Sequence, residues 1–102
     1  MILFGDINKG LMEYKSTTGA ILVDVREKTE YASGHISGAV NEPLSMISKT
    51  SLPKELPVFL YCLRGSRSRK AAGILKKMGY TKVKSIGGIN GYKGELVQDK
   101  QI

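Results

Sequence analysis

Two short apolar runs constrain the fold of this chain most strongly. Residues 20–25 and 58–61 are rich in β-branched and other apolar side chains and show almost no alternation with polar residues. Such runs are typical of strands in a parallel sheet whose two faces are both covered by helices. Apolar residues at helical spacing follow the second run as far as Met78, and Gly79 is a suitable end for that helix. Strands alternating with helices predict an α/β fold with a mostly parallel central sheet and helices on both faces.

The other expected elements are short and fit the same layered plan. Asp6 can cap a first helix that runs to about Lys15. The remaining expected segments are a helix at 27–32, a brief strand at 39–40, a helical turn or two at 44–48, a strand at 83–86 and a turn at 87–88. A length of 102 residues with 41% apolar content suits one domain, residues 1–102, with a single core of ordinary size.

Composition limits the environment and the partners. One cysteine cannot form an internal disulfide, which favours a reducing compartment. We see no signal-like segment and no apolar run approaching the roughly 18 residues of a membrane span, so we expect a cytoplasmic protein without a membrane partner. The net charge of +7 attracts small anions, but the lysines are scattered and are not interleaved with aromatic residues. Nucleic acid is therefore not an expected partner.

The single cysteine, Cys62, lies where the second apolar run ends and an arginine-bearing turn leads into a helix. Ligands of open α/β sheets collect at the carboxyl ends of strands, and the N–H groups of a tight loop and a helix start favour negative charge. Helix N-termini and nearby arginines lower a thiol pKa from about 8.5 to roughly 3.5–7.5. The sequence therefore predicts a nucleophilic thiolate in an exposed loop rather than a cysteine that only packs.

A metal centre is not expected. Metal sites need three or four clustered ligands, whereas the chain has one cysteine and one histidine, His35. We therefore expect no metal and no cofactor.

Three motifs in a fixed order carry a resemblance to a known family. They are LVDVRE at residues 22–27, GHISGAVN at residues 34–41 and CLRGSRS at residues 62–68, followed by a Gly-Gly-Ile at residues 87–89. In this the chain resembles the rhodanese domain, a sulfurtransferase family whose active loop reads Cys, four residues, Arg, then Ser or Thr. The resemblance covers nearly the whole chain. It implies a single rhodanese-like domain with a central sheet between helices.

The resemblance also implies a reaction, that of a thiosulfate sulfurtransferase. The Cys62 thiolate would attack the outer sulfur of thiosulfate or a persulfide donor and become a persulfide, with sulfite released from thiosulfate. Cyanide or a cellular thiol would then take the sulfur, so the kinetics should be ping-pong. The expected partners are a small anionic sulfur donor and a thiol or cyanide acceptor, with a protein donor or acceptor as a further option. Because the chain has one cysteine, the sulfur must leave to an external acceptor.

The residues of the loop would bind the substrate. They are Leu63, Arg64, Gly65, Ser66 and Arg67, and their N–H groups would point at the sulfur. Arg67 could pair bidentately with an oxyanion, which lysine would do less well. We expect Arg64 to face solvent, either gathering the donor or simply solvated. Many family members carry Arg or Lys where this chain has Leu63, which leaves the preferred donor open.

Other motif residues are expected to support the site. In the family, residues at the positions of Asp24, Arg26 and Glu30 mainly hold the neighbouring loop by hydrogen bonds and ion pairs. Ser68 would cap or pack the helix start. A Cys-His pair would be a natural nucleophile and base, but His35 lies in a family turn motif, and we assign it a structural role.

Two alternatives remain open. Related folds that act as phosphatases or arsenate reductases have five residues between the cysteine and the arginine, whereas five residues after Cys62 lead here to Ser68. The shorter loop leaves less room for a tetrahedral phosphoryl group. The other alternative is a non-catalytic rhodanese-like module that binds partners or carries sulfur. Such modules often lack the cysteine, so its presence weighs against a purely binding role.

Overall fold

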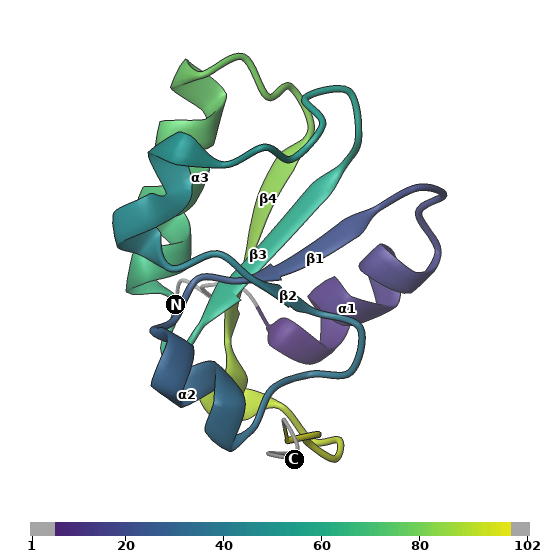
Figure 1. Ribbon diagram of the computed structural model, residues 1–102. Helices are drawn as coiled ribbons and strands as arrows, with labels where there is room; N and C mark the ends of the chain where they lie inside the picture. The colour runs from purple at the N-terminus through teal and green to yellow at the C-terminus, as the bar shows by residue number, and fades with distance from the viewer. Residues whose placement is uncertain (1–5, 99–102) are drawn as a thin grey trace.

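The computed structural model describes residues 6–98, and their elements follow the order expected from the sequence (Figure 1). In chain order they are α1 (Ile7–Lys15), β1 (Ile21–Asp24), α2 (Lys28–Ser33), β2 (Val40–Asn41), the 3-10 helix η1 (Leu44–Lys49), β3 (Val58–Cys62), α3 (Ser66–Lys77), β4 (Val83–Gly88) and the 3-10 helix η2 (Ile89–Gly91). Asp6 caps α1 by accepting a hydrogen bond from the backbone N–H of Asn8 at 3.0 Å, as predicted. Within the described residues, no helix is long and apolar enough to cross a membrane.

The described strands form a four-stranded sheet in the order β2-β1-β3-β4, and every neighbouring pair is parallel. The two apolar runs supply the interior strands β1 and β3, which confirms the prediction made from their composition. Each has a strand on both sides and side chains buried on both faces, so an unbroken apolar sequence is what its surroundings require.

Helices cover both faces of the sheet, as Figure 1 shows with α1 on one side and α3 on the other. Along β3 the side chains alternate between two clusters. Leu60 and Cys62 pack with Ala71 and Leu75 of α3 in one of them. The other cluster holds alternate residues of β3 together with apolar residues of α1; these are Phe59, Tyr61, Ile7 and Leu11. The predicted α/β architecture is confirmed.

The end of β4 differs from the sequence prediction. The glycines at 87–88 were expected to form a turn, but both belong to the strand, and Gly88 pairs with Cys62 after a shift of register. Gly87 has φ +110°, a conformation that residues with a side chain rarely adopt, and it lies at this irregularity. A Cβ on Gly88 would lie 2.3 Å from the carbonyl oxygen of Leu63. Glycine therefore allows the strand to lie directly against the loop that follows Cys62.

Candidate active site

Cys62 is the last residue of β3, at the carboxyl edge of the sheet, and α3 begins four residues later. Gly65 occupies the N-cap of α3 with φ +104°, a left-handed conformation that turns its N–H toward the cysteine. The Cys62 Sγ accepts hydrogen bonds from the N–H of Gly65 at 2.9 Å and of Ser68 at 3.4 Å. The carbonyl of Leu63 is bonded to the N–H of Asn90 at 3.2 Å. The loop therefore directs donors at the sulfur while a carbonyl of the same loop is bonded elsewhere.

The balance of burial and hydrogen bonding favours the thiolate. Burial alone would raise the pKa of the Cys62 thiol, because a charged sulfur loses its hydration. The N–H and hydroxyl of Ser68 and the N–H groups of Gly65 and Arg64 outweigh burial and lower the pKa below its ordinary value. The direction agrees with the sequence prediction. The groups responsible are backbone and hydroxyl donors at the start of α3, which favour the charged form of the sulfur without a neighbouring base.

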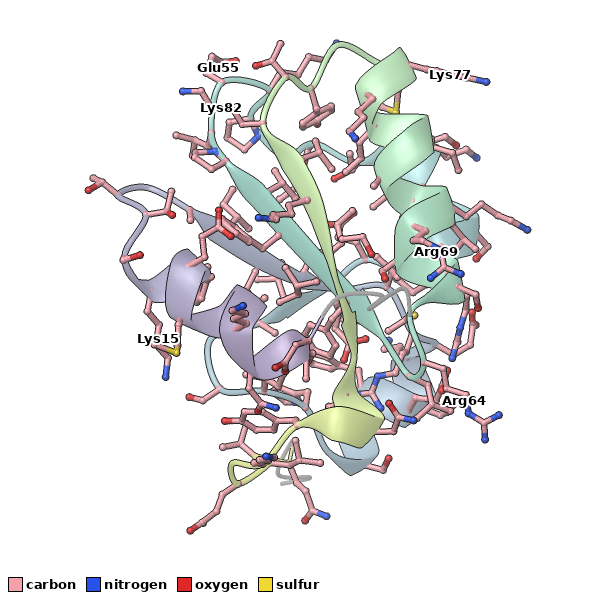
Figure 2. All side chains as sticks on the ribbon, turned by 180° about the vertical axis from the view of Figure 1, so that it is seen from behind. Lys15, Glu55, Arg64, Arg69, Lys77 and Lys82 are labelled. Atoms are coloured by element: carbon pink, nitrogen blue, oxygen red, sulfur yellow. The ribbon has the colours of Figure 1, made fainter. Side chains whose placement is uncertain are left out.

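The expectation that Cys62 lies in an exposed loop is wrong. Its exposed fraction is 1%, and it belongs to the core cluster on the α3 side of the sheet. The reason is that β3 extends to Cys62 and pairs there with Gly88, so a strand covers the residue that the sequence suggested had left the sheet. Arg64 is exposed as expected, and Figure 2 shows its side chain extending away from the body of the protein.

Arg67 is engaged by a carboxylate of the chain itself. Its Nη1 and Nη2 donate to the Oε1 and Oε2 of Glu30 at 2.7 and 3.1 Å, in a bidentate pair that joins α3 to α2. Both side chains are 30% exposed. The hydrogen bond from Arg67, opposed by burial and aided by the N–H of Glu27, lowers the pKa of Glu30 to about 2. The fork expected to receive an oxyanion therefore holds an ionised carboxylate at neutral pH in this structure.

Asp24 and Arg26 lie at the end of β1, where they form a buried ion pair. The Nη2 of Arg26 donates to Asp24 Oδ2 at 2.7 Å and to the carbonyl of Gly34 at 2.6 Å. Asn41 donates from its Nδ2 to the carbonyls of Asp24 and Arg26, both at 2.9 Å. These contacts connect the end of β1 to Gly34 after α2 and to Asn41 of β2.

His35 is buried against α2. Its Nδ1 lies 2.8 Å from the carbonyl oxygen of Tyr31, and its ring stacks on the Tyr31 ring with centroids 3.7 Å apart. Its backbone exchanges two hydrogen bonds with Val97. The imidazole is thus held by Tyr31 of α2, and the His35 backbone by the segment after η2. Both of these ring contacts are made with Tyr31, and neither involves Cys62.

Ser68 and Ser85 form a pair that sequence reasoning described only in part. Ser68 is fully buried, and its Oγ donates to the carbonyl of Gly65 at 3.0 Å. It also lies 2.7 Å from the Oγ of Ser85 on β4 and 3.7 Å from the Cys62 Sγ. The sequence missed Ser85 because its role depends on β4 being the neighbour of β3. The one signal in the sequence that could have pointed to Ser85 was its position, two residues before the Gly87-Gly88 pair.

The residues that surround Cys62 offer no arrangement for a metal ion. Within residues 6–98, no three His, Cys, Asp or Glu side chains are grouped so that they could hold one.

Comparison with known proteins agrees with this geometry. The Rhodanese-like domain family matches residues 7–95. The chain is 39% identical over 100 residues to the uncharacterized protein YqhL of Bacillus subtilis, covering 92% of this chain and 79% of that one. It is 39% identical over 71 residues to the thiosulfate sulfurtransferase PspE of Escherichia coli, covering 66% and 68%.

Solved structures show the same fold. A rhodanese with anions from E. coli superposes with a TM-score of 0.70 at 32% identity, covering 78% of this chain and 99% of that one. A rhodanese-related protein from Thermoplasma volcanium gives a TM-score of 0.75 at 25% identity, covering 88% and 95%. With a loop whose N–H groups bind the cysteine sulfur at the carboxyl edge of a parallel sheet, and a family match over most of its length, this chain belongs to the rhodanese-like sulfurtransferase family.

Proposed function

We propose that this protein is a thiosulfate or persulfide sulfurtransferase that carries a sulfane sulfur on Cys62. The observation that carries the proposal is the convergence of the Gly65 and Ser68 N–H groups on the Cys62 Sγ, together with the lowered pKa of that thiol. The names of two relatives support it, since PspE of E. coli and GlpE of Pseudomonas fluorescens are both thiosulfate sulfurtransferases. A reducing cytoplasm, expected from the single cysteine, would suit this chemistry.

The reaction has two balanced halves. In the first, the Cys62 thiolate attacks the outer sulfur of thiosulfate, the S–S bond of the donor breaks, and sulfite leaves with the electron pair. In the second, cyanide or a thiolate attacks the outer sulfur of the Cys62 persulfide, and the electron pair of the broken S–S bond returns to Sγ. The thiolate is regenerated without an added oxidant or reductant, as covalent catalysis requires.

The loop provides the electrostatic part of the mechanism. Its N–H groups, at residues 63–67 and at Ser68, would hold the negative charge of the thiolate and of the terminal persulfide sulfur. Gly65 provides the left-handed backbone that makes this arrangement possible. Arg64 is exposed on the same loop and would attract an anionic donor without holding it in one geometry.

Steady-state kinetics test the proposal. Initial rates of thiocyanate formation, measured with thiosulfate varied at several cyanide concentrations, should give the parallel double-reciprocal lines of a ping-pong mechanism. The Cys62→Ser variant should be inactive while folding normally. An aryl phosphate serves as the rival substrate, and cysteine-dependent hydrolysis of it in place of thiocyanate formation would contradict the proposal and favour a phosphatase.

A persulfide donor is favoured over thiosulfate by one specific observation. The Arg67 fork is bonded to Glu30, and the residue after the cysteine is the uncharged Leu63, so two places that would hold the oxyanion of thiosulfate do not offer a free cation in this structure. Within the proposed function we therefore expect a low-molecular-weight persulfide to load Cys62 faster than thiosulfate does. Single-turnover loading with glutathione persulfide and with thiosulfate at equal concentration tests this, and faster loading by thiosulfate would contradict it.

A further inference from the structure

Ser85 is a half-buried residue of β4 with a hydroxyl that the proposed reaction does not yet use. Its Oγ lies 2.7 Å from the Oγ of Ser68, and either hydroxyl can be the donor. Ser68 is fully buried at the start of α3, and its Oγ lies 3.7 Å from the Cys62 Sγ. Three polar side chains from β4, α3 and β3 thus form a connected line that ends at the nucleophile.

The number of hydrogens available to Ser68 gives this line a direction. A serine hydroxyl donates once and accepts twice, and the carbonyl of Gly65, 3.0 Å from Ser68 Oγ, can only accept. With Cys62 as a neutral thiol, its S–H donates to Ser68, and Ser68 donates to Gly65. Once the thiol proton has left to solvent, the sulfur can only accept, and the contact stays favourable if Ser68 turns its single hydrogen toward Sγ.

Ser85 can complete the ionised arrangement. When Cys62 loses its proton, the Ser68 oxygen loses the hydrogen that it accepted from sulfur. The Ser85 hydroxyl is at hydrogen-bonding distance to donate to that oxygen instead. A hydroxyl that accepts a hydrogen bond is polarised and becomes a stronger donor, so the effect of Ser85 would reach the sulfur through Ser68.

We propose that Ser85 is a positioning residue that donates to Ser68 and so holds the Ser68 hydroxyl as a donor to the Cys62 thiolate. The inference rests on the proposed function, because the thiolate is the form that attacks a sulfur donor. Among the groups that act on the thiol pKa, burial raises it and the Ser68 hydroxyl is one of those that lower it. The charged side chains of the cysteine loop and the start of α3 include the exposed Arg64, Arg67, which is paired with Glu30 and whose charge interacts with Cys62, and Arg69, whose Nη1 lies beside Gly65. The test leaves all of them unchanged.

The test compares two near-isosteric variants, Ser85→Val and Ser85→Thr. Both have branched side chains that suit a strand, and threonine alone keeps the hydroxyl. The readout is the pH dependence of iodoacetamide alkylation, followed by intact-protein mass, and it reports Cys62 alone because the chain has one cysteine. We expect Ser85→Val to raise the Cys62 pKa by about half a unit, or about three-fold less thiolate at a pH below the pKa, and Ser85→Thr to stay near the unsubstituted protein.

A double-mutant cycle shows whether Ser85 acts through Ser68. Ser68→Ala should raise the Cys62 pKa further than Ser85→Val does, and combining the two should add little. Ser48→Ala, an exposed serine of η1, is the matched control and should leave the pKa unchanged. Ser85→Ala gives the same readout with less bulk if the valine variant does not fold.

Three results would overturn the inference: an unchanged Cys62 pKa in Ser85→Val and Ser85→Ala, an equal shift in Ser85→Thr, or fully additive shifts in the double variant. The alkylation needs no sulfur donor. Failure of sulfur transfer in the unsubstituted protein would therefore reject the proposed function and leave the pKa result as a separate finding.

Discussion

The contact between Gly88 and the cysteine loop can be tested by adding a single methyl group. A Cβ built on Gly88 lies 2.3 Å from the carbonyl oxygen of Leu63 and 2.6 Å from the Cα of Arg64, where ordinary contact begins at 3.4 Å. Both atoms belong to the backbone, so no side-chain rotation relieves the clash. Gly88 itself has φ −121°, which alanine adopts freely. The cost of Gly88→Ala is therefore steric, and it falls on the loop.

The loop has to move by about 1 Å to accept this methyl group, and overpacking of that kind costs about 1–3 kcal/mol. For a domain of this size, such a loss lowers Tm by roughly 4–8 °C per kcal/mol. Displacing the loop also withdraws the N–H groups that point at Cys62, so the pKa of its thiol should rise. Denaturant unfolding gives the change in the free energy of unfolding, and pH-dependent alkylation gives the pKa.

The matched control is Gly73→Ala in α3. Its Cβ would meet nothing within 4 Å, and an alanine inside a helix is more stable than glycine by about 0.5–1 kcal/mol. We expect this variant to be more stable with an unchanged Cys62 pKa. If Gly88→Ala matched the unsubstituted protein in both stability and Cys62 pKa, the argument that this glycine shapes the loop would be refuted.

Three further predictions concern the sulfur and the ion pair beside it. Cys62→Ser should abolish thiocyanate formation with little loss of stability, which activity and thermal unfolding would check, because the smaller hydroxyl keeps the hydrogen-bonding pattern of the buried site. Because the Arg67 fork is bonded to Glu30, Arg67→Lys should leave the KM for thiosulfate nearly unchanged; a clearly raised KM would show that Arg67 leaves Glu30 to bind the oxyanion, for which a planar fork suits better than a point charge. The pKa of Glu30 is about 2 in the folded protein, whereas its ordinary value is 4.5. The ion pair therefore stabilises the fold fully above about pH 4.5, and this stabilisation is lost as the pH falls toward 2. Because both groups are partly exposed, we expect Glu30→Gln to cost only about 1 kcal/mol at pH 7 and to remove that part of the acid dependence of unfolding; an identical acid profile in the variant would count against the pair.

Much of the fold could be predicted because β1 and β3 are buried on both faces, and a strand in that position has an unbroken apolar sequence. The helix after Cys62 was equally readable from the spacing of Ala71 and Leu75. The pairing of the strands could not be predicted from the sequence. Nothing local in the sequence states that β4 lies beside β3, and for that reason the glycines at 87–88 were interpreted as a turn and the burial of Cys62 was missed.

The site was predictable to the extent that it is local in sequence. Gly65 and Ser68 lie three and six residues from Cys62, and their donors follow from the geometry of a strand, a tight loop and a helix start. Long-range partners could not be found in this way. The bond from Arg67 to Glu30 and the contact of Ser68 with Ser85 span 37 and 17 residues, and each depends on how separate elements pack.

The measurement that tests the central claim most directly is the intact mass of the protein after incubation with a sulfur donor. With thiosulfate, and separately with glutathione persulfide, we predict a gain of about 32 Da that peptide mapping assigns to Cys62. Addition of cyanide should remove this mass with an equal amount of thiocyanate formed, and Cys62→Ser should show neither change. A protein that gains no sulfur from either donor, or that retains it when cyanide is added, would contradict the account of Cys62 as the carrier of a transferable sulfur.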